Sequence, residues 1–277
     1  MDNDLELSAG RIHVTRGGEG PPLLLIHGWV VSGLYFRAVR PALEQRYTVY
    51  TLDLPGHGDS ASPPPDRFAY DLPAFASLVT EAMDALSIPS ARVWGHSMGG
   101  GVAMTLAARH PERVERLVLE DAAVYPFPFP LKGRLAFLPL VGRSLFTKLY
   151  MKRDLVNHLR SVHLDPRVAT DEDVEYFWQR FNRPGAREAL YASLTTLHSL
   201  TDDNADPANV KAPTLVLWGD SDPTVPPSRA ERLAKAIPGA RLEIVRACGH
   251  SPHEEKPDEA LRAILPFLDG EAAAAAS

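Results

Sequence analysis

A serine flanked by small residues is the first feature of this chain that could do chemistry. Ser97 lies at the centre of Gly95-His96-Ser97-Met98-Gly99, between a run that predicts a strand and a run that predicts a helix. A strand-to-helix turn this sharp exposes its hydroxyl only if the residues two positions away lack side chains, so the glycines fit a nucleophilic serine. The helix N-terminus would add free N–H groups that stabilise a developing oxyanion. The alternative is a serine that only caps the helix.

A serine hydroxyl is a weak nucleophile at neutral pH, so a base and an orienting carboxylate must lie within its reach. Asp222 and His250 each follow a predicted strand in the last third of the chain. In a doubly wound sheet, ligands and catalytic groups gather at the carboxyl ends of the strands. The chain order serine, acid, histidine is the one expected on successive strands of this fold. We therefore predict Ser97 as nucleophile, Asp222 as acid and His250 as base.

Other acidic and basic side chains compete for these roles. Glu120 ends the strand after the serine turn and is an alternative acid, and Asp220 lies only two residues before Asp222. His253 is an alternative base, but the two glutamates that follow it predict a solvated face. Five further residues are expected to make structural hydrogen bonds or to shape loops: His27, His57, His96, Asp53 and Asp59.

The elements that must position these residues follow an alternating pattern. A hairpin is expected over residues 5–15. Apolar or β-rich runs predict strands at 23–26, 47–52, 91–94, 114–119, 214–218 and 241–245. Helical spacing predicts helices at 34–45, 71–86, from the serine turn to 110, 228–237 and 257–268. Strands that alternate with helices of this length imply an α/β fold, with a mostly parallel central sheet and helices on both faces.

The alternation breaks between residues 122 and 209. Three prolines within 125–130 argue against a central strand, because proline removes ladder donors. Helical patterns follow at 143–161, at 171–181 with Thr170 as cap, and at 187–200. We expect 122–209 to be a helical cap, or lid, inserted into a core formed by 1–121 and 210–277. Its apolar residues are expected to fill the cap and, in part, to line an apolar pocket: Phe127, Phe129, Leu131, Leu135, Phe137, Leu138, Leu140, Phe146, Leu149 and Tyr150.

Composition narrows the class of protein. The chain has 277 residues, 45% of them apolar and 23% charged, which is typical of a globular domain. The net charge is −6 and the basic residues are scattered, so no nucleic-acid partner is expected. The acidic N-terminus is unlike a secretory signal and no run is long enough to span a bilayer, so we expect a cytoplasmic protein without integral membrane contact. The single cysteine, Cys248, excludes an intrachain disulfide and is expected to be a buried small residue.

Taken together, the motifs resemble the α/β-hydrolase family over residues 5–268. The matching residues are His27-Gly28-Trp29, Asp53-Leu54-Pro55-Gly56-His57-Gly58, Gly95-His96-Ser97-Met98-Gly99, Gly219-x-x-Asp222 and Gly249-His250. The resemblance implies an oxyanion hole made by the backbone N–H groups of Trp29 and Met98, with the Trp29 side chain lining the acyl side of the pocket. The sequence shows no cluster with metal-ligand spacing and no Gly-x-Gly-x-x-Gly after the first strand. We therefore expect neither a metal nor a dinucleotide cofactor.

For activity, the resemblance is to serine esterases and lipases that carry a helical lid. It implies two-step acyl transfer on a small-molecule ester with a hydrophobic acyl chain of short to medium length. Serine at the turn disfavours dehalogenase and epoxide hydrolase chemistry, which uses a carboxylate there. One alternative is a carbon–carbon hydrolase of the same fold, which needs a basic cap residue such as Arg180, Arg183 or Arg187 to hold a substrate carboxylate. Another is a ligand receptor or binding scaffold that retains the triad.

Overall fold

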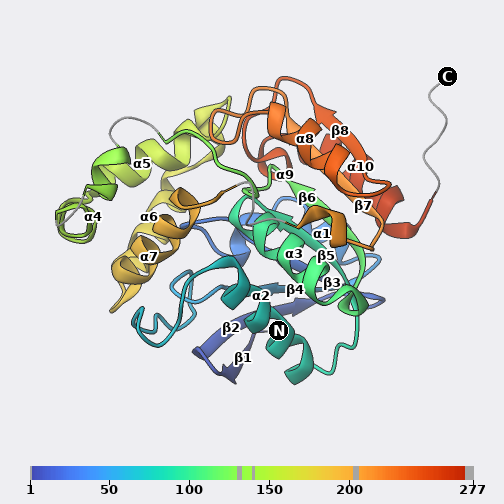
Figure 1. Ribbon diagram of the computed structural model, residues 1–277, viewed down its shortest axis with the longest axis horizontal. Coiled ribbons are helices and arrows are strands. Elements are labelled where there is room, and N and C mark those ends of the chain that lie inside the picture. Colours follow the sequence, from blue (N-terminus) through green and yellow to red (C-terminus); the bar gives the residue numbers. More distant parts are fainter. Residues whose placement is uncertain (1, 130–132, 139–140, 202–205, 272–277) are drawn as a thin grey trace.

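One twisted sheet forms the centre of the molecule (Figure 1). The computed structural model describes residues 2–129, 133–138, 141–201 and 206–271. Within these ranges the strand order is β1-β2-β4-β3-β5-β6-β7-β8. The strands are β1 Asp2–Leu7, β2 Gly10–Gly17, β3 Pro22–Ile26, β4 Thr48–Leu52, β5 Ala91–His96, β6 Val114–Glu120, β7 Thr214–Gly219 and β8 Arg241–Val245. β1 and β2 pair antiparallel, and β3 to β8 pair parallel. The expected mostly parallel α/β sheet is confirmed.

Helices cover both faces of this sheet. They are α1 Arg40–Leu43, α2 Leu72–Ala85, α3 Met98–Arg109, α4 Gly142–Leu149, α5 Lys152–Ser161, α6 Asp171–Phe181, α7 Ala186–His198, α8 Ser228–Ala236, α9 Pro252–Glu255 and α10 Pro257–Asp269. Strand β3 shows how the two faces divide. Leu24 and Ile26 join a buried cluster with α2 and α3, whereas Leu23 and Leu25 join a second buried cluster with α10. Successive side chains of a strand point to opposite faces, so a continuous apolar run is buried on both.

The helix predicted at 34–45 is wrong. The structure has a 3₁₀ turn at Gly33–Phe36, and then the short helix α1. Ser32 accepts a hydrogen bond from the Leu34 N–H and so caps the first turn. Pro41 stands in the first turn of α1, where its missing N–H is tolerated, but inside one long helix it would remove a hydrogen bond. The apolar spacing continues across residues 34–45, but Pro41 prevents one continuous helix there.

The helix predicted at 143–161 is likewise divided, into α4 and α5. Tyr150 and Met151 have extended backbone conformations, with ψ of 118° and 162°. The Asp154 carboxylate accepts the Met151 N–H at 2.8 Å, which supplies a partner for an N–H group at the start of α5. A new helix therefore begins at Lys152 although the helical spacing continues across the break.

Helices α4 to α7 lie together on one side of the sheet, between β6 and β7 in the chain (Figure 1). Their buried apolar residues form a cluster with the loop after β3, in which Tyr35 contacts Phe177 with ring centroids 6.4 Å apart. Phe146 is buried there, as expected, but three leucines expected to fill the cap are exposed at 52%, 44% and 63%: Leu135, Leu138 and Leu149. Leu131 and Leu140 lie outside the described residues. The division into core and cap at 121/122 and 209/210 stays a prediction.

Among the helices of the described residues, none combines the length and the apolar character that a bilayer span requires.

Candidate active site

The turn between β5 and α3 holds Ser97 in a strained backbone conformation, with φ 53° and ψ −118°. A Cβ atom at Gly95 would lie 2.3 Å from the Gly99 carbonyl oxygen, and one at Gly99 would lie 2.1 Å from the Ile26 carbonyl oxygen. No side chain fits at either position, so the two glycines allow the backbones around the serine to pass. The end of β6 also stabilises the turn, because Ser97 N–H donates to the Glu120 carbonyl at 2.9 Å.

Three side chains predicted from the sequence meet at this turn. His250 Nε2 lies 2.8 Å from Ser97 Oγ, and His250 Nδ1 lies 2.7 Å from Asp222 Oδ2. The other carboxylate oxygen of Asp222 accepts the N–H groups of Thr224 and Val225 at 2.7 and 3.0 Å. Proton donation from Nδ1 to the carboxylate leaves Nε2 free to accept the serine proton. The arrangement can therefore deprotonate a hydroxyl at the moment when it attacks.

The main chain of His250 is held from two sides. Its N–H donates to the Val162 carbonyl, in the segment after α5, at 2.8 Å. Its carbonyl accepts a hydrogen bond from His96 Nε2 at 2.9 Å. A Cβ atom at Gly249 would lie 2.6 Å from the Val162 oxygen, so this glycine allows the close approach. The imidazole is thus positioned by the sheet and by the helical segment together.

The two N–H groups predicted for an oxyanion hole lie on either side of the serine. Met98 is the first residue of α3, so its N–H has no partner within that helix. A Cβ atom at Gly28 would lie 3.2 Å from Ser97 Cβ, which places the backbone just before Trp29 against the serine. The hole itself stays a prediction, because its function depends on a bound oxyanion.

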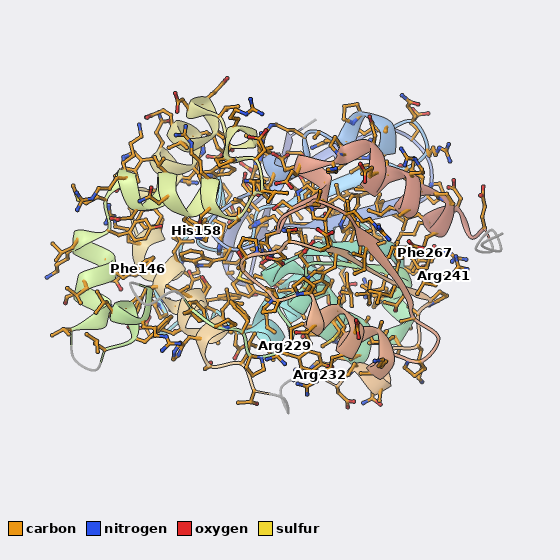
Figure 2. The ribbon with its side chains drawn as sticks, turned by 90° about the horizontal axis from the view of Figure 1, so that it is seen from above. Phe146, His158, Arg229, Arg232, Arg241 and Phe267 are labelled. Carbon is orange, nitrogen blue, oxygen red and sulfur yellow. The ribbon has the colours of Figure 1, made fainter. Side chains whose placement is uncertain are left out.

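Two side chains of the helical region pack against Trp29, the residue that follows Gly28. The Trp29 indole donates to the Leu190 carbonyl at 3.0 Å, and its ring packs edge-on against His158 with centroids 5.2 Å apart. Phe146 also packs against Trp29, with ring centroids 6.1 Å apart. Figure 2 shows Phe146 and His158 in the same helical region. Burial, with smaller contributions from His250 and His163, lowers the pKa of His158 to about 4, so this imidazole is neutral at pH 7. No motif in the sequence marks His158, because its position beside Trp29 depends on how α5 packs.

The alternative acid and base form a separate pair. Glu120 Oε2 lies 2.8 Å from His253 Nδ1, and both side chains are fully buried. Glu120 also accepts Trp94 Nε1–H at 2.9 Å and the His253 N–H at 2.8 Å. The solvated face expected at His253 is wrong, because the His253 side chain is fully buried. The adjacent Glu254 side chain is only 3% exposed and forms an ion pair with Arg37. Asp220 bonds the Ser221 hydroxyl instead of an imidazole.

The structural roles expected for the loop residues are confirmed. His27 Nδ1 donates to the Gly28 carbonyl at 2.7 Å, and its Nε2 accepts the Leu54 N–H. Burial lowers the pKa of His27 to about 4 and that of His57 to about 3, so both are neutral hydrogen-bonding groups. Asp53 accepts the N–H groups of Gly33 and Asp59 and thereby closes its loop.

The three arginines considered for a substrate carboxylate are occupied by protein groups. Arg180 Nη2 lies 3.0 Å from Asp59 Oδ2, and its guanidinium stacks on Tyr176. Arg183 donates to the Gly58 carbonyl at 2.6 Å. Arg187 donates to the carbonyls of residues 147 and 150 and to the side chain of residue 182. These arginines join elements of the fold to one another.

One residue beside the triad was missed in the sequence. Asp121 is fully buried, and one of its oxygens lies within 4.8 Å of a carboxylate oxygen of Asp222 and a ring nitrogen of His250. A signal was present, because Asp121 directly follows Glu120 at the carboxyl end of β6, where functional side chains gather.

Comparison with known proteins agrees with this architecture. The family model described as alpha/beta hydrolase fold matches residues 21–257. The chain is 31% identical over 276 residues to a 2-hydroxy-6-oxononadienedioate/2-hydroxy-6-oxononatrienedioate hydrolase of Comamonas testosteroni, covering 96% of this chain and 94% of the relative. It is 29% identical over 256 residues to the pimeloyl-(acyl-carrier protein) methyl ester esterase of Nitrosomonas europaea, covering 90% and 96%. A solved meta-cleavage product hydrolase of Pseudomonas fluorescens matches with a TM-score of 0.82 at 28% identity, covering 97% of each chain.

Proposed function

Because the chain belongs to the α/β-hydrolase family, we propose that it hydrolyses carboxylic esters with hydrophobic acyl chains of short to medium length. The observation that carries the proposal is the hydrogen-bond series from Asp222 Oδ2 through His250 to Ser97 Oγ, with distances of 2.7 and 2.8 Å. These distances already lie within the range for direct proton transfer between nucleophile and base. The esterase relative from Nitrosomonas europaea supports the same reaction class.

In the proposed reaction, Ser97 Oγ attacks the ester carbonyl while His250 Nε2 takes the hydroxyl proton. Backbone N–H groups of Trp29 and Met98 stabilise the tetrahedral oxyanion, each contributing about 3 kcal/mol to the transition state. The C–O bond to the alcohol breaks, and the leaving alcohol takes the proton from His250. Water then attacks the acyl-enzyme in the same way and releases the acid. Asp222 holds the imidazole tautomer and stabilises its charged form in both steps.

Carbon–carbon bond hydrolysis is the second candidate, favoured by the relatives from Comamonas testosteroni and Pseudomonas fluorescens. The name of the first relative describes a substrate with two carboxylates. The observations on the helical region favour an uncharged substrate instead. Arg180, Arg183 and Arg187 are engaged with protein groups. Two histidines of that region, His158 and His163, are neutral because burial lowers the pKa of each to about 4.

The helical cap, residues 122–209, is proposed as a lid over this site. Ser97 is only 9% exposed in the structure, so movement of the cap or of an adjoining loop would widen the access of an ester to its hydroxyl. Trp29 and Phe146 would then form an apolar wall for the acyl chain, with His158 packed against Trp29.

The test is hydrolysis of p-nitrophenyl esters from acetate to octanoate by the wild type and Ser97→Ala. Ser199→Ala, a change of an exposed serine at the end of α7, is the matched control. We expect turnover with a chain-length optimum for the wild type and the control, and none for Ser97→Ala. If only a 2-hydroxy-6-oxo-dienoate is cleaved, the carbon–carbon reaction replaces the ester proposal. If the folded protein cleaves neither but binds a ligand stoichiometrically, it is a receptor.

A further inference from the structure

Asp121 is a buried carboxyl group that the proposed reaction does not use. It follows β6 with a positive φ of 44°, and its N–H continues the sheet by donating to the Leu217 carbonyl at 3.0 Å. Its Oδ1 accepts the Gly219 N–H at 3.1 Å. Its Oδ2 is also buried, and no donor among the described residues forms a hydrogen bond with it. A buried carboxylate oxygen without a donor is costly and requires an explanation.

The surroundings of Asp121 contain too much negative charge for another free carboxylate. Asp222, on the loop after β7, lies within 4.8 Å together with His250, on the loop after β8. Glu120 precedes it on β6 and adds a further negative charge. Two carboxyl groups buried this close do not both ionise. Burial, then the charges of Asp222 and Glu120, raises the pKa of Asp121 well above its ordinary value.

We propose that Asp121 is a positioning residue that keeps its proton and donates a hydrogen bond from Oδ2 to the carboxylate of Asp222. This inference rests on the hydrolytic role proposed for Asp222. Two ionised carboxylates can only accept hydrogen bonds, so they cannot bond each other. A proton on Asp121 Oδ2 turns this oxygen into a donor, which explains why it has no other donor beside it in the described part of the chain. Asp222 has room for this bond, since its known donors are two backbone N–H groups and one imidazole.

The proton on Asp121 has a consequence for the base. A hydrogen bond to Asp222 draws negative charge away from the side of the carboxylate that faces His250. The charged imidazolium is then less stabilised, so His250 remains available as a base at lower pH. An ionised Asp121 would do the opposite, because a second negative charge nearby would stabilise the imidazolium. The two protonation states of Asp121 therefore predict shifts of opposite sign.

The test compares Asp121→Asn and Asp121→Leu with the wild type, using p-nitrophenyl butyrate over pH 5 to 9. The acidic limb of the kcat/KM profile reports protonation of the essential base. Asparagine keeps a donor, and like aspartate it tolerates positive φ, so we expect its midpoint within about 0.3 pH unit of the wild type. Leucine removes the donor, so we expect the midpoint to rise by about half a unit, with a lower kcat. If the midpoint falls in both variants, Asp121 is ionised and the proposal is wrong.

A second measurement does not depend on activity. A protonated carboxyl group gives an infrared C=O band, and we expect the wild type at pH 8 to show a component of this band that Asp121→Asn lacks. Asp220→Asn, at an exposed carboxylate two residues from Asp222, is the control that should retain the band. Absence of the band from the wild type overturns the proposal. The proposal also fails if EDTA removes activity, because a metal ion would then join the two carboxylates. A band without any ester turnover would refute the ester reaction and leave the protonation of Asp121 standing.

Discussion

His250 Nε2 lies 2.8 Å from Ser97 Oγ although 153 residues separate the two in the chain. Ser97 follows β5 and His250 follows β8, with β6 and β7 between them in the sheet. Because these strands are parallel, their carboxyl ends reach the same edge, and the loops close the remaining gap. The sheet topology thus brings the pair together.

Asp222→Asn is expected to lower ester turnover by about four orders of magnitude, because an amide holds the imidazole in the wrong tautomer. The fold should be unaffected, since the amide retains an oxygen for the N–H groups of Thr224 and Val225. Steady-state kinetics and far-ultraviolet circular dichroism measure the two effects. Near-normal turnover in this variant would show that another carboxylate serves as the acid.

Glu120→Gln provides the contrast. Glu120 lies against His253 and Trp94, so its replacement should lower the free energy of unfolding by about 1–3 kcal/mol. Turnover should change little, because His250 does not bond this carboxylate. Urea unfolding and kinetics on the same preparation test both statements. A loss of turnover as large as that of Asp222→Asn at unchanged stability would reverse the assignment of the acid.

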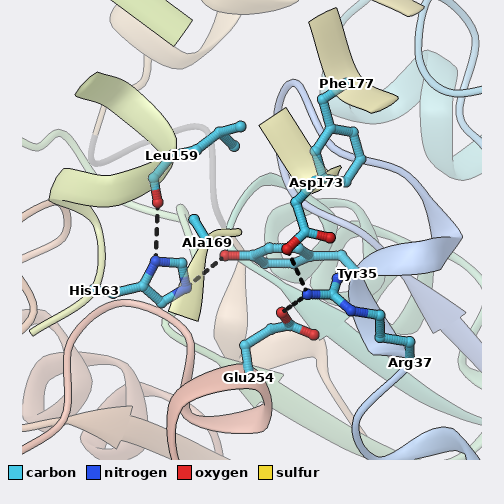
Figure 3. A pocket seen from close by; sticks show the side chains of 8 residues that line it. All are labelled: Tyr35, Arg37, Leu159, His163, Ala169, Asp173, Phe177 and Glu254. Carbon is cyan, nitrogen blue, oxygen red and sulfur yellow. Dashed lines mark hydrogen bonds and ion pairs between the residues drawn. The ribbon is translucent and has the colours of Figure 1, made fainter. Parts of the chain in front are cut away.

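The contact between the cap and the core should depend on pH through Glu254. Arg37 lies 2.9 Å from Asp173 on α6 and 3.0 Å from Glu254 on α9 (Figure 3). Burial raises the pKa of Glu254 to about 7, and the charges of His253 and Arg37 only partly oppose this. An acid with a raised pKa binds more protons in the folded state, so its contribution to stability falls as pH rises from about 4.5 to 7.

Glu254→Gln removes this dependence. Relative to the wild type, we expect the variant to gain stability between pH 5 and pH 8, by at most roughly 3 kcal/mol. Urea unfolding at both pH values measures the difference. A constant difference between the two proteins across this range would exclude titration of Glu254.

A positive charge at position 158 should weaken the base. Positive charges at positions 158 and 250 disfavour each other. A lysine at position 158 would therefore oppose protonation of the base, so His158→Lys is expected to move the acidic limb of the kcat/KM profile to lower pH by about half a unit. His158→Gln, which keeps a neutral polar group, should leave the limb in place. Equal profiles for the lysine and glutamine variants would place His158 too far from the site to affect it.

The turn around Ser97 should not accept a methyl group at Gly95. The added Cβ would lie 2.3 Å from the Gly99 carbonyl oxygen, so Gly95→Ala should cost at least about 2 kcal/mol in unfolding free energy and abolish turnover. Gly239→Ala is the control, because its Cβ would meet no atom within 4 Å and only the positive φ opposes it. Similar losses in both variants would mean that crowding at Gly95 is unimportant.

The features predicted correctly from the sequence are those set by local sterics and by the order of strands. The glycines at 95 and 99 identify the serine turn because only they allow the backbones to pass. Asp222 could be placed because it follows the buried apolar strand β7, and His250 because it follows the strand predicted at 241–245, which is the partly exposed strand β8. In a parallel sheet, that position alone determines the edge at which a side chain lies.

Several predictions that proved wrong concern side-chain burial, which depends on residues far away in the chain. The glutamates after His253 suggest solvent exposure, but Arg37 buries one of them through an ion pair from another part of the chain. Leu149 fits a buried helix face by its spacing, yet it is 63% exposed because nothing in the described structure covers that side of α4. Neither the ion pair of Glu254 nor the exposure of Leu149 can be seen in a short window of sequence.

The hydrogen bond from His250 N–H to the Val162 carbonyl ties the base to the helical region at the end of α5. This region cannot move away at α5 without either breaking the bond or carrying the histidine backbone with it. An aligned base and a docked α5 are therefore favoured in the same state of the molecule. By thermodynamic linkage, a small molecule that wedges α5 open would act as an inhibitor at a distance, and one that clamps it shut would favour the aligned triad.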